Sequence, residues 1–105
     1  MAEVSPYIVE LVYKLIEESK KFNINISKVI LFGSQIKGTA HEWSDIDLAV
    51  VSDDFQGIRF YDNQKIMRAK LNTSYDLEIH PYRPEDFTED NPFVQEILSH
   101  GIRIV

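Results

Sequence analysis

Two pairs of acidic residues stand where they could bind metal together. Asp45 and Asp47 are separated by one residue, and so are Asp76 and Glu78. Because side chains alternate between the faces of a β-strand, the members of each pair project from one face if their segments are strands. Two divalent ions about 3.5 to 4 Å apart can hold the oxygens of a phosphoryl transfer when carboxylates converge from one side. The pairs therefore predict metal-dependent phosphoryl chemistry.

The two acidic pairs are expected to contribute differently. Asp45 and Asp47 would be roughly 7 Å apart at Cα, close enough for both side chains to bind a shared pair of ions. A third carboxylate would bind one ion and take the proton from an attacking hydroxyl, and either Asp76 or Glu78 could supply it. The spacing does not decide between them. His80 follows on the same predicted face and is a secondary candidate for a nucleotide or metal contact.

A glycine–serine pair, Gly33 and Ser34, precedes the first acidic pair. A glycine at the end of a strand lets backbone N–H groups approach a phosphate, and the serine hydroxyl adds a donor. We therefore expect a triphosphate to bind at this turn, bridged to the metal ions, with Lys37 as a further contact. A solvated loop explains Lys37 and His41 equally well, and Trp43 could either stack on a base or cover the edge of the core.

Helices and strands that would position these residues follow from the apolar pattern. Helical spacing predicts helices, and short β-branched or alternating runs predict strands. We expect helices over 6–22, 58–71 and 92–100, strands over 28–32, 46–51 and 75–80, and an edge strand over 102–105. Ser5 with Pro6, and Asn91 with Pro92, are good helix starts. The third strand is expected to place Tyr75, Leu77 and Ile79 on one face and Asp76, Glu78 and His80 on the other.

Length and composition limit the classes of protein to consider. The chain has 105 residues, 44 % of them hydrophobic, which predicts one folded domain over 1–105. The formal net charge of -6 is opposite to what affinity for free nucleic acid requires. Cysteine is absent, so disulfides, thiolate metal sites and cysteine nucleophiles are excluded. No apolar stretch predicts a membrane span, and we expect a cytoplasmic protein.

The motif residues resemble those of a known superfamily. Residues 33–38 (Gly-Ser-Gln-Ile-Lys-Gly), followed by 44–50 (Ser-Asp-Ile-Asp-Leu-Ala-Val), are similar to the signature of the polymerase β nucleotidyltransferases, and most of all to the minimal nucleotidyltransferases. The resemblance is detailed over 29–51, and the strand with Asp76 and Glu78 stands where a third carboxylate is expected. Gln35 departs from the pattern, because many relatives have a basic residue there. The resemblance implies an α+β fold with a mixed sheet of about four strands and helices mainly on one side.

This resemblance also implies an activity. It implies transfer of a nucleoside monophosphate, most simply AMP from ATP or another nucleoside triphosphate, to a hydroxyl with release of pyrophosphate. Two Mg²⁺ ions, or Mn²⁺ in their place, would be held by Asp45 and Asp47 with Asp76 or Glu78. Several members of the group resemble antitoxins paired with a small helical HEPN-type toxin, which some of them adenylylate on a tyrosine.

Two other interpretations stay open at this stage. One is a weakly active or inactive nucleotide-binding antitoxin module that neutralises a helical partner by docking. The other is an acidic metal-storage or structural domain, which would bind divalent ions without preference for nucleotide. The sequence also leaves open whether the chain forms a homo-oligomer.

Overall fold

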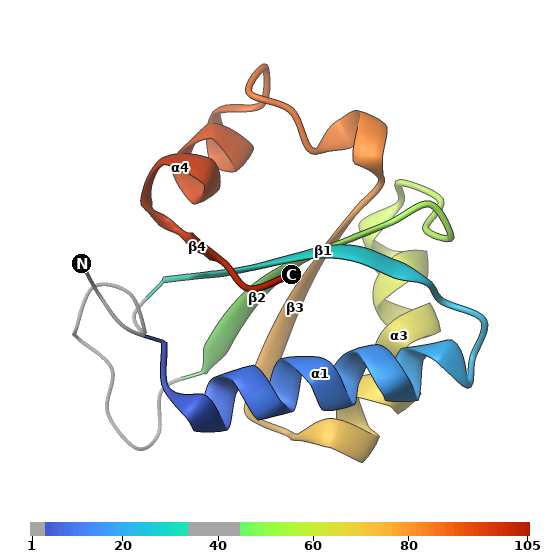
Figure 1. Ribbon diagram of the computed structural model, residues 1–105. Coiled ribbons are helices and arrows are strands. Elements are labelled where there is room, and N and C mark those ends of the chain that lie inside the picture. The colour runs from blue at the N-terminus through green and yellow to red at the C-terminus, as the bar shows by residue number, and fades with distance from the viewer. Residues whose placement is uncertain (1–3, 34–44) are drawn as a thin grey trace.

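A mixed β-sheet forms the centre of the molecule (Figure 1). The computed structural model describes residues 4–33 and 45–105. These residues form four strands, β1 (Ile26–Phe32), β2 (Ile46–Ser52), β3 (Leu77–Tyr82) and β4 (Ile102–Arg103), in the order β3-β2-β1-β4. Strand β1 is antiparallel to both β2 and β4, whereas β2 and β3 are parallel. The expected mixed sheet of four strands is confirmed.

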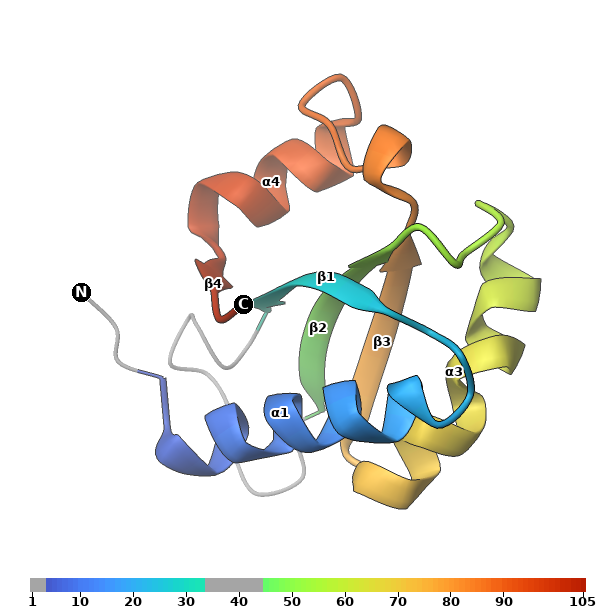
Figure 2. The same ribbon diagram turned by 45° about the vertical axis from the view of Figure 1, so that its right-hand side comes forward.

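Helices cover the two faces of the sheet unequally. The long helices α1 (Pro6–Lys20) and α3 (Arg59–Thr73) lie on one face, and the shorter α4 (Pro92–His100) lies on the other (Figure 2). A single 3-10 turn, η1 (Pro84–Asp86), connects β3 toward α4. The prediction that helices lie mainly on one side is therefore confirmed. Within the described residues, no helix is long and apolar enough to cross a membrane.

Local capping explains where two of the helices begin. The Ser5 hydroxyl accepts the N–H of Tyr7 at 3.2 Å, and the Asn91 side chain accepts the N–H of Phe93 at 2.9 Å. In both helices a proline occupies the first turn, where backbone N–H groups have no partner within the helix, so the N–H that proline lacks is not needed. Both predicted helix starts are confirmed.

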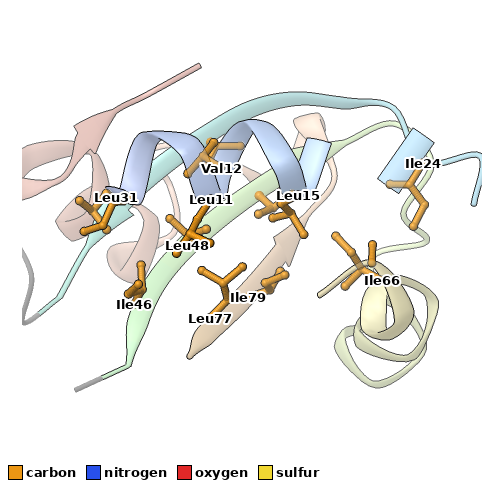
Figure 3. Packing of buried hydrophobic residues seen from close by; sticks show 14 of the residues in the cluster. Leu11, Val12, Leu15, Ile24, Leu31, Ile46, Leu48, Ile66, Leu77 and Ile79 are labelled. Carbon is orange, nitrogen blue, oxygen red and sulfur yellow. The ribbon is translucent and has the colours of Figure 1, made fainter. Parts of the chain in front are cut away.

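The larger hydrophobic core lies between the sheet and the two long helices. Side chains from α1, α3 and three strands converge there, among them Leu11, Leu15, Leu31, Leu48, Ile66 and Leu77 (Figure 3). Asp62 of α3 is buried beside this core, and its carboxylate accepts the N–H groups of Gln56 and Gly57 at 2.7 and 2.9 Å. These bonds satisfy the buried charge and fix the turn that leads into α3.

The third strand begins two residues later than expected. Helix α3 continues to Thr73, and Ser74 then accepts the N–H of Asp76, so Asp76 belongs to a turn. Tyr75 is 80 % exposed instead of facing the core with Leu77, and this part of the prediction was wrong. The strand instead runs through Pro81, which an edge strand tolerates because its outer side needs no N–H.

Candidate active site

Asp47 lies on the central strand β2, on the face opposite the larger core. Its neighbours across the sheet are Phe32 of β1 and Glu78 of β3. The alternation of β2 sends Leu48 into the larger core and leaves Asp47 on the other face, as predicted. The Asp47 side chain is 22 % exposed. A carboxylate held between two flanking strands has a well-defined position.

Glu78 stands directly beside Asp47 because β2 and β3 are parallel and in register there. Asp47, Glu78 and His80 each offer one ligand atom, and these atoms all lie within 4.8 Å of one another. The Glu78 side chain is 48 % exposed, because β3 is an edge strand. Two carboxylates at this separation are suitable donors for a hard divalent cation, and Glu78 is also open to an approaching group.

His80 is the most buried member of this group, with a side chain only 10 % exposed. Its Nε2 lies 3.4 Å from Oδ1 of Asp47 and 4.0 Å from Oε1 of Glu78. Its Nδ1 lies 3.0 Å from Nη2 of Arg59, the first residue of α3. The sequence indicated His80 only as a secondary candidate and gave no signal for Arg59, which is 21 residues away in the chain.

Gly33 approaches Asp47 from the end of β1. Its φ of +81° is in the left-handed region, and a Cβ added there would collide with Oδ2 of Asp47. The backbone therefore favours glycine, and a side chain at this position would displace the Asp47 carboxylate. Ser34 and Lys37, the other predicted phosphate contacts, lie outside the described residues, as do His41 and Trp43.

The two remaining predicted metal ligands, Asp45 and Asp76, lie just before the strands that carry Asp47 and Glu78. Asp45 is exposed and directly precedes β2, and Asp76 directly precedes β3. The backbone carbonyl of Asp76 accepts the N–H of Ile46 at 2.8 Å, which joins the beginnings of the two strands. Among residues 4–33 and 45–105, the cluster within 4.8 Å includes neither Asp45 nor Asp76. Their roles as metal ligands stay predictions.

A groove of about 310 Å³ opens beside Glu78, between α3 and β3. Polar and basic side chains line it together with apolar ones, namely Arg59, Asn63, Ile66, Met67, Lys70, Glu78 and Ile79. Of Asp47, Glu78 and His80, Glu78 alone lines this groove.

A larger hollow of about 630 Å³ lies near the other end of β3 and reaches the start of α4. None of Asp47, Glu78 and His80 lines it. Its Arg83 is paired with Asp86 through bonds of 2.7 and 3.0 Å, and this pairing raises the pKa of the guanidinium and lowers that of the carboxyl. Burial raises the pKa of the neighbouring Tyr82 phenol. Arg83 and Asp86 neutralise each other in this hollow, so the acidic cluster of Asp47, Glu78 and His80 is the better candidate for a metal site.

The sequence over residues 14–105 matches the family described as "Polymerase beta, Nucleotidyltransferase". The chain belongs to this family. The superfamily resemblance drawn from the glycine–serine turn and the aspartate pair is thereby confirmed, and so is the fold class expected from it.

Two similar proteins of Methanocaldococcus jannaschii carry the provisional name protein adenylyltransferase. MJ1305 is 33 % identical over 93 residues, which cover 82 % of this chain and 62 % of the relative. The chain thus spans less than two thirds of that protein. MJ0141 is 28 % identical over 101 residues, covering 87 % of this chain and 99 % of the relative.

Solved structures share the fold. A provisional nucleotidyltransferase from Sulfolobus solfataricus superposes with a TM-score of 0.62 over 98 % of this chain and 89 % of its own, at 17 % identity. A toxin–antitoxin structure solved with AMP-PNP superposes with a TM-score of 0.57 over 92 % of this chain and 72 % of its own, at 26 % identity. The first likeness concerns the fold alone, while the second is also one of sequence.

Proposed function

We propose that this chain is a metal-dependent adenylyltransferase that moves AMP from ATP to a hydroxyl group of a partner protein. The observation that carries the proposal is the pairing of Asp47 with Glu78 beside the Gly33 turn, in a member of the nucleotidyltransferase family. The names of the two archaeal relatives support a protein acceptor, and the AMP-PNP in the similar toxin–antitoxin structure supports an adenine nucleotide.

In this proposal Glu78, and not Asp76, is the third carboxylate. Glu78 is in register with Asp47 and belongs to the cluster within 4.8 Å, whereas Asp76 lies in the turn before the strand. The exposure of Glu78 also suits a base that must meet an incoming hydroxyl. Asp45 retains its proposed place as the partner of Asp47, two residues before it on the chain.

The carboxylate donors fit Mg²⁺ or Mn²⁺, which prefer oxygen ligands. Asp45, Asp47 and Glu78 would hold two such ions, which supply charge neutralisation at the triphosphate and activation of the hydroxyl. The backbone at Gly33 and the Ser34 hydroxyl would hold the phosphates, with Lys37 as a further contact. Glu78 would take the acceptor proton as the acceptor oxygen bonds to the α-phosphorus. The bond from that phosphorus to pyrophosphate then breaks, and pyrophosphate leaves.

The acceptor would enter through the groove between α3 and β3. Asn63 and Lys70 line this groove and can hold a polar group near Glu78. The similar toxin–antitoxin structure supports a protein partner. The family resemblance suggests that this partner would be a small helical HEPN-type protein, with tyrosine as the modified residue. Consumption of ATP and the lack of cysteine fit a cytoplasmic location.

The experiment measures transfer of label from α-³²P-ATP, with Mg²⁺, to the protein encoded beside this chain. Glu78→Gln is compared with Asp76→Asn, because both neutralise one carboxylate of the same segment. We expect Glu78→Gln and Asp47→Asn to lose transfer and Asp76→Asn to keep most of it. Transfer that persists in Asp47→Asn would count against the enzyme. Loss of transfer in Asp76→Asn, with transfer kept in Glu78→Gln, would make Asp76 the third carboxylate in place of Glu78.

A second candidate is an antitoxin that acts by docking without catalysis. The outer side of α3 supports it, because Phe60, Met67 and Leu71 are exposed there on one side of the helix. In that case Asp47→Asn would still neutralise the partner, whereas Phe60→Ser with Leu71→Ser would not. If neutralisation instead depends on catalysis, the single substitution Asp47→Asn is enough to abolish it.

A further inference from the structure

Three side chains from three different elements form a continuous hydrogen-bonded chain that ends on Asp47. Arg59 of α3 contacts His80 of β3 at 3.0 Å, and His80 contacts Asp47 of β2 at 3.4 Å. We propose that His80 is a positioning residue that holds the Asp47 carboxylate by donating its Nε2–H, in a tautomer that Arg59 fixes. This inference rests on the proposed function, since Asp47 is taken there to be a metal ligand.

The tautomer follows from what each group is able to donate. A guanidinium carries only N–H donors and no acceptor. Because Arg59 faces Nδ1 of His80, that nitrogen must be the acceptor and carries no proton. The proton of the neutral ring is then on Nε2, which faces Oδ1 of Asp47. Both ends of the ring are thereby assigned.

A ring in this tautomer supports a metal ligand without being one. An Nε2 that carries a proton has no lone pair to give to an ion, although it lies within 4.8 Å of the carboxylate oxygens of Asp47 and Glu78. A donated hydrogen bond at Oδ1 of Asp47 leaves Oδ2, which borders Gly33 at the predicted phosphate turn. Partners of this kind orient ligating carboxylates in many metal sites.

Packing keeps the ring from turning away. The rings of His80 and Phe32 meet edge to face with centroids 4.9 Å apart, and the centroid of the Phe93 ring of α4 lies 6.1 Å from that of His80. Phe32 is also the strand neighbour of Asp47. The aromatic contacts fix the ring plane, and the bonds to Arg59 and Asp47 fix its direction within that plane.

The first test measures the tautomer of His80 directly. Long-range ¹H–¹⁵N correlation spectra of the whole chain identify the His80 ring by its absence in His80→Gln. We expect a proton on Nε2 in the wild type, retained with Mg²⁺ and AMP-PNP, and a mixture of tautomers in Arg59→Ala. A ring protonated on Nδ1, or one that loses its Nε2 proton when Mg²⁺ and AMP-PNP are added, would overturn the proposal. The spectrum of the free protein reports the His80 tautomer whether or not nucleotide transfer is found, so failure of the proposed function and failure of this proposal can be told apart.

The second test compares a donor with an apolar replacement of similar size. Mn²⁺ affinity is measured by electron paramagnetic resonance for His80→Leu and His80→Gln, with thermal unfolding measured in parallel. We expect His80→Leu to weaken Mn²⁺ binding roughly 10-fold to 100-fold. His80→Gln should recover most of the affinity, because its amide N–H can replace the Nε2–H. Mn²⁺ affinity that is weakened equally in both variants would show that His80 is a metal ligand. Unchanged Mn²⁺ affinity in both would show that it is only a packing residue. Either result would overturn the proposal.

Discussion

The two faces of the central sheet differ in how completely they are covered. On one face, α1 and α3 bury side chains such as Leu48 and Val50 entirely. On the other, α4 covers a smaller cluster around Ile30 and Val94, and this face also carries Asp47. Consecutive residues of β2 therefore lie in different surroundings, with Leu48 in the larger core and Asp47 on the opposite face. The pleat of β2 separates the core residues from Asp47, which we propose binds metal, so substitutions on the two faces should have separable effects.

The largest expected effect is the loss of activity in Asp47→Asn. Metal ligation contributes several kcal/mol at the transition state, so the rate of AMP transfer should fall by about 10³-fold or more. The melting temperature should hardly change, because the side chain is partly exposed and lies beside another carboxylate. Rate assays and thermal unfolding on the same preparation check this. A large loss of stability would show that the faces are not separable.

Leu48→Ala tests the opposite face through the neighbouring residue of the same strand. Leu48 is fully buried, so truncation should cost about 2 to 5 kcal/mol of unfolding free energy through lost burial and a cavity. Urea denaturation measures this cost. The rate of transfer, measured well below the melting temperature, should remain near that of the wild type. An unchanged free energy of unfolding would contradict the assignment of Leu48 to the larger core.

Gly33→Ala should affect both properties, because Gly33 joins the core strand β1 to the site. The left-handed backbone would cost about 1 to 2 kcal/mol of stability. The new methyl group would also displace the Asp47 carboxylate, so Mn²⁺ affinity should fall more than the modest change in stability suggests. Parallel denaturation and Mn²⁺ titration check this, and normal Mn²⁺ affinity would contradict the predicted contact.

The smallest expected effect concerns Asp86, which is on the site's side of the sheet but outside the acidic cluster. The hydrogen bond from Arg83 lowers the pKa of Asp86 below its ordinary 3.8. A lowered pKa gives stability that is present above the ordinary value and is lost as pH falls through the lowered one. The melting temperature of Asp86→Asn should thus lie slightly below that of the wild type at neutral pH and meet it in strong acid. Mn²⁺ affinity at neutral pH should not change.

Much of the fold could be predicted from local patterns. The capping residues Ser5 and Asn91 located two helix starts. The alternation around Asp47 assigned that residue to the face opposite Ile46, Leu48 and Val50. The strand containing Glu78 was predicted, but its beginning was placed too early because the extension of α3 to Thr73 was not visible in the apolar pattern.

The site was only partly predictable. Asp47, Glu78 and Gly33 were identified from residue type and spacing, and the structure brings these three together. The metal-binding roles of Asp45 and Asp76, and the phosphate contacts of Ser34 and Lys37, stay predictions. Arg59 was missed, because an arginine at the start of an amphipathic helix has no local feature that points to a histidine on a strand.

The sequence by itself determined the types of element and the face on which Asp47 projects, because these depend on residues that are near one another in the chain. Only the tertiary structure decided that β3 lies parallel to β2 in a register that sets Glu78, and not Asp76, beside Asp47. Only it placed Arg59 against His80. Strand register and contacts between distant elements depend on how whole surfaces pack, which no local pattern contains.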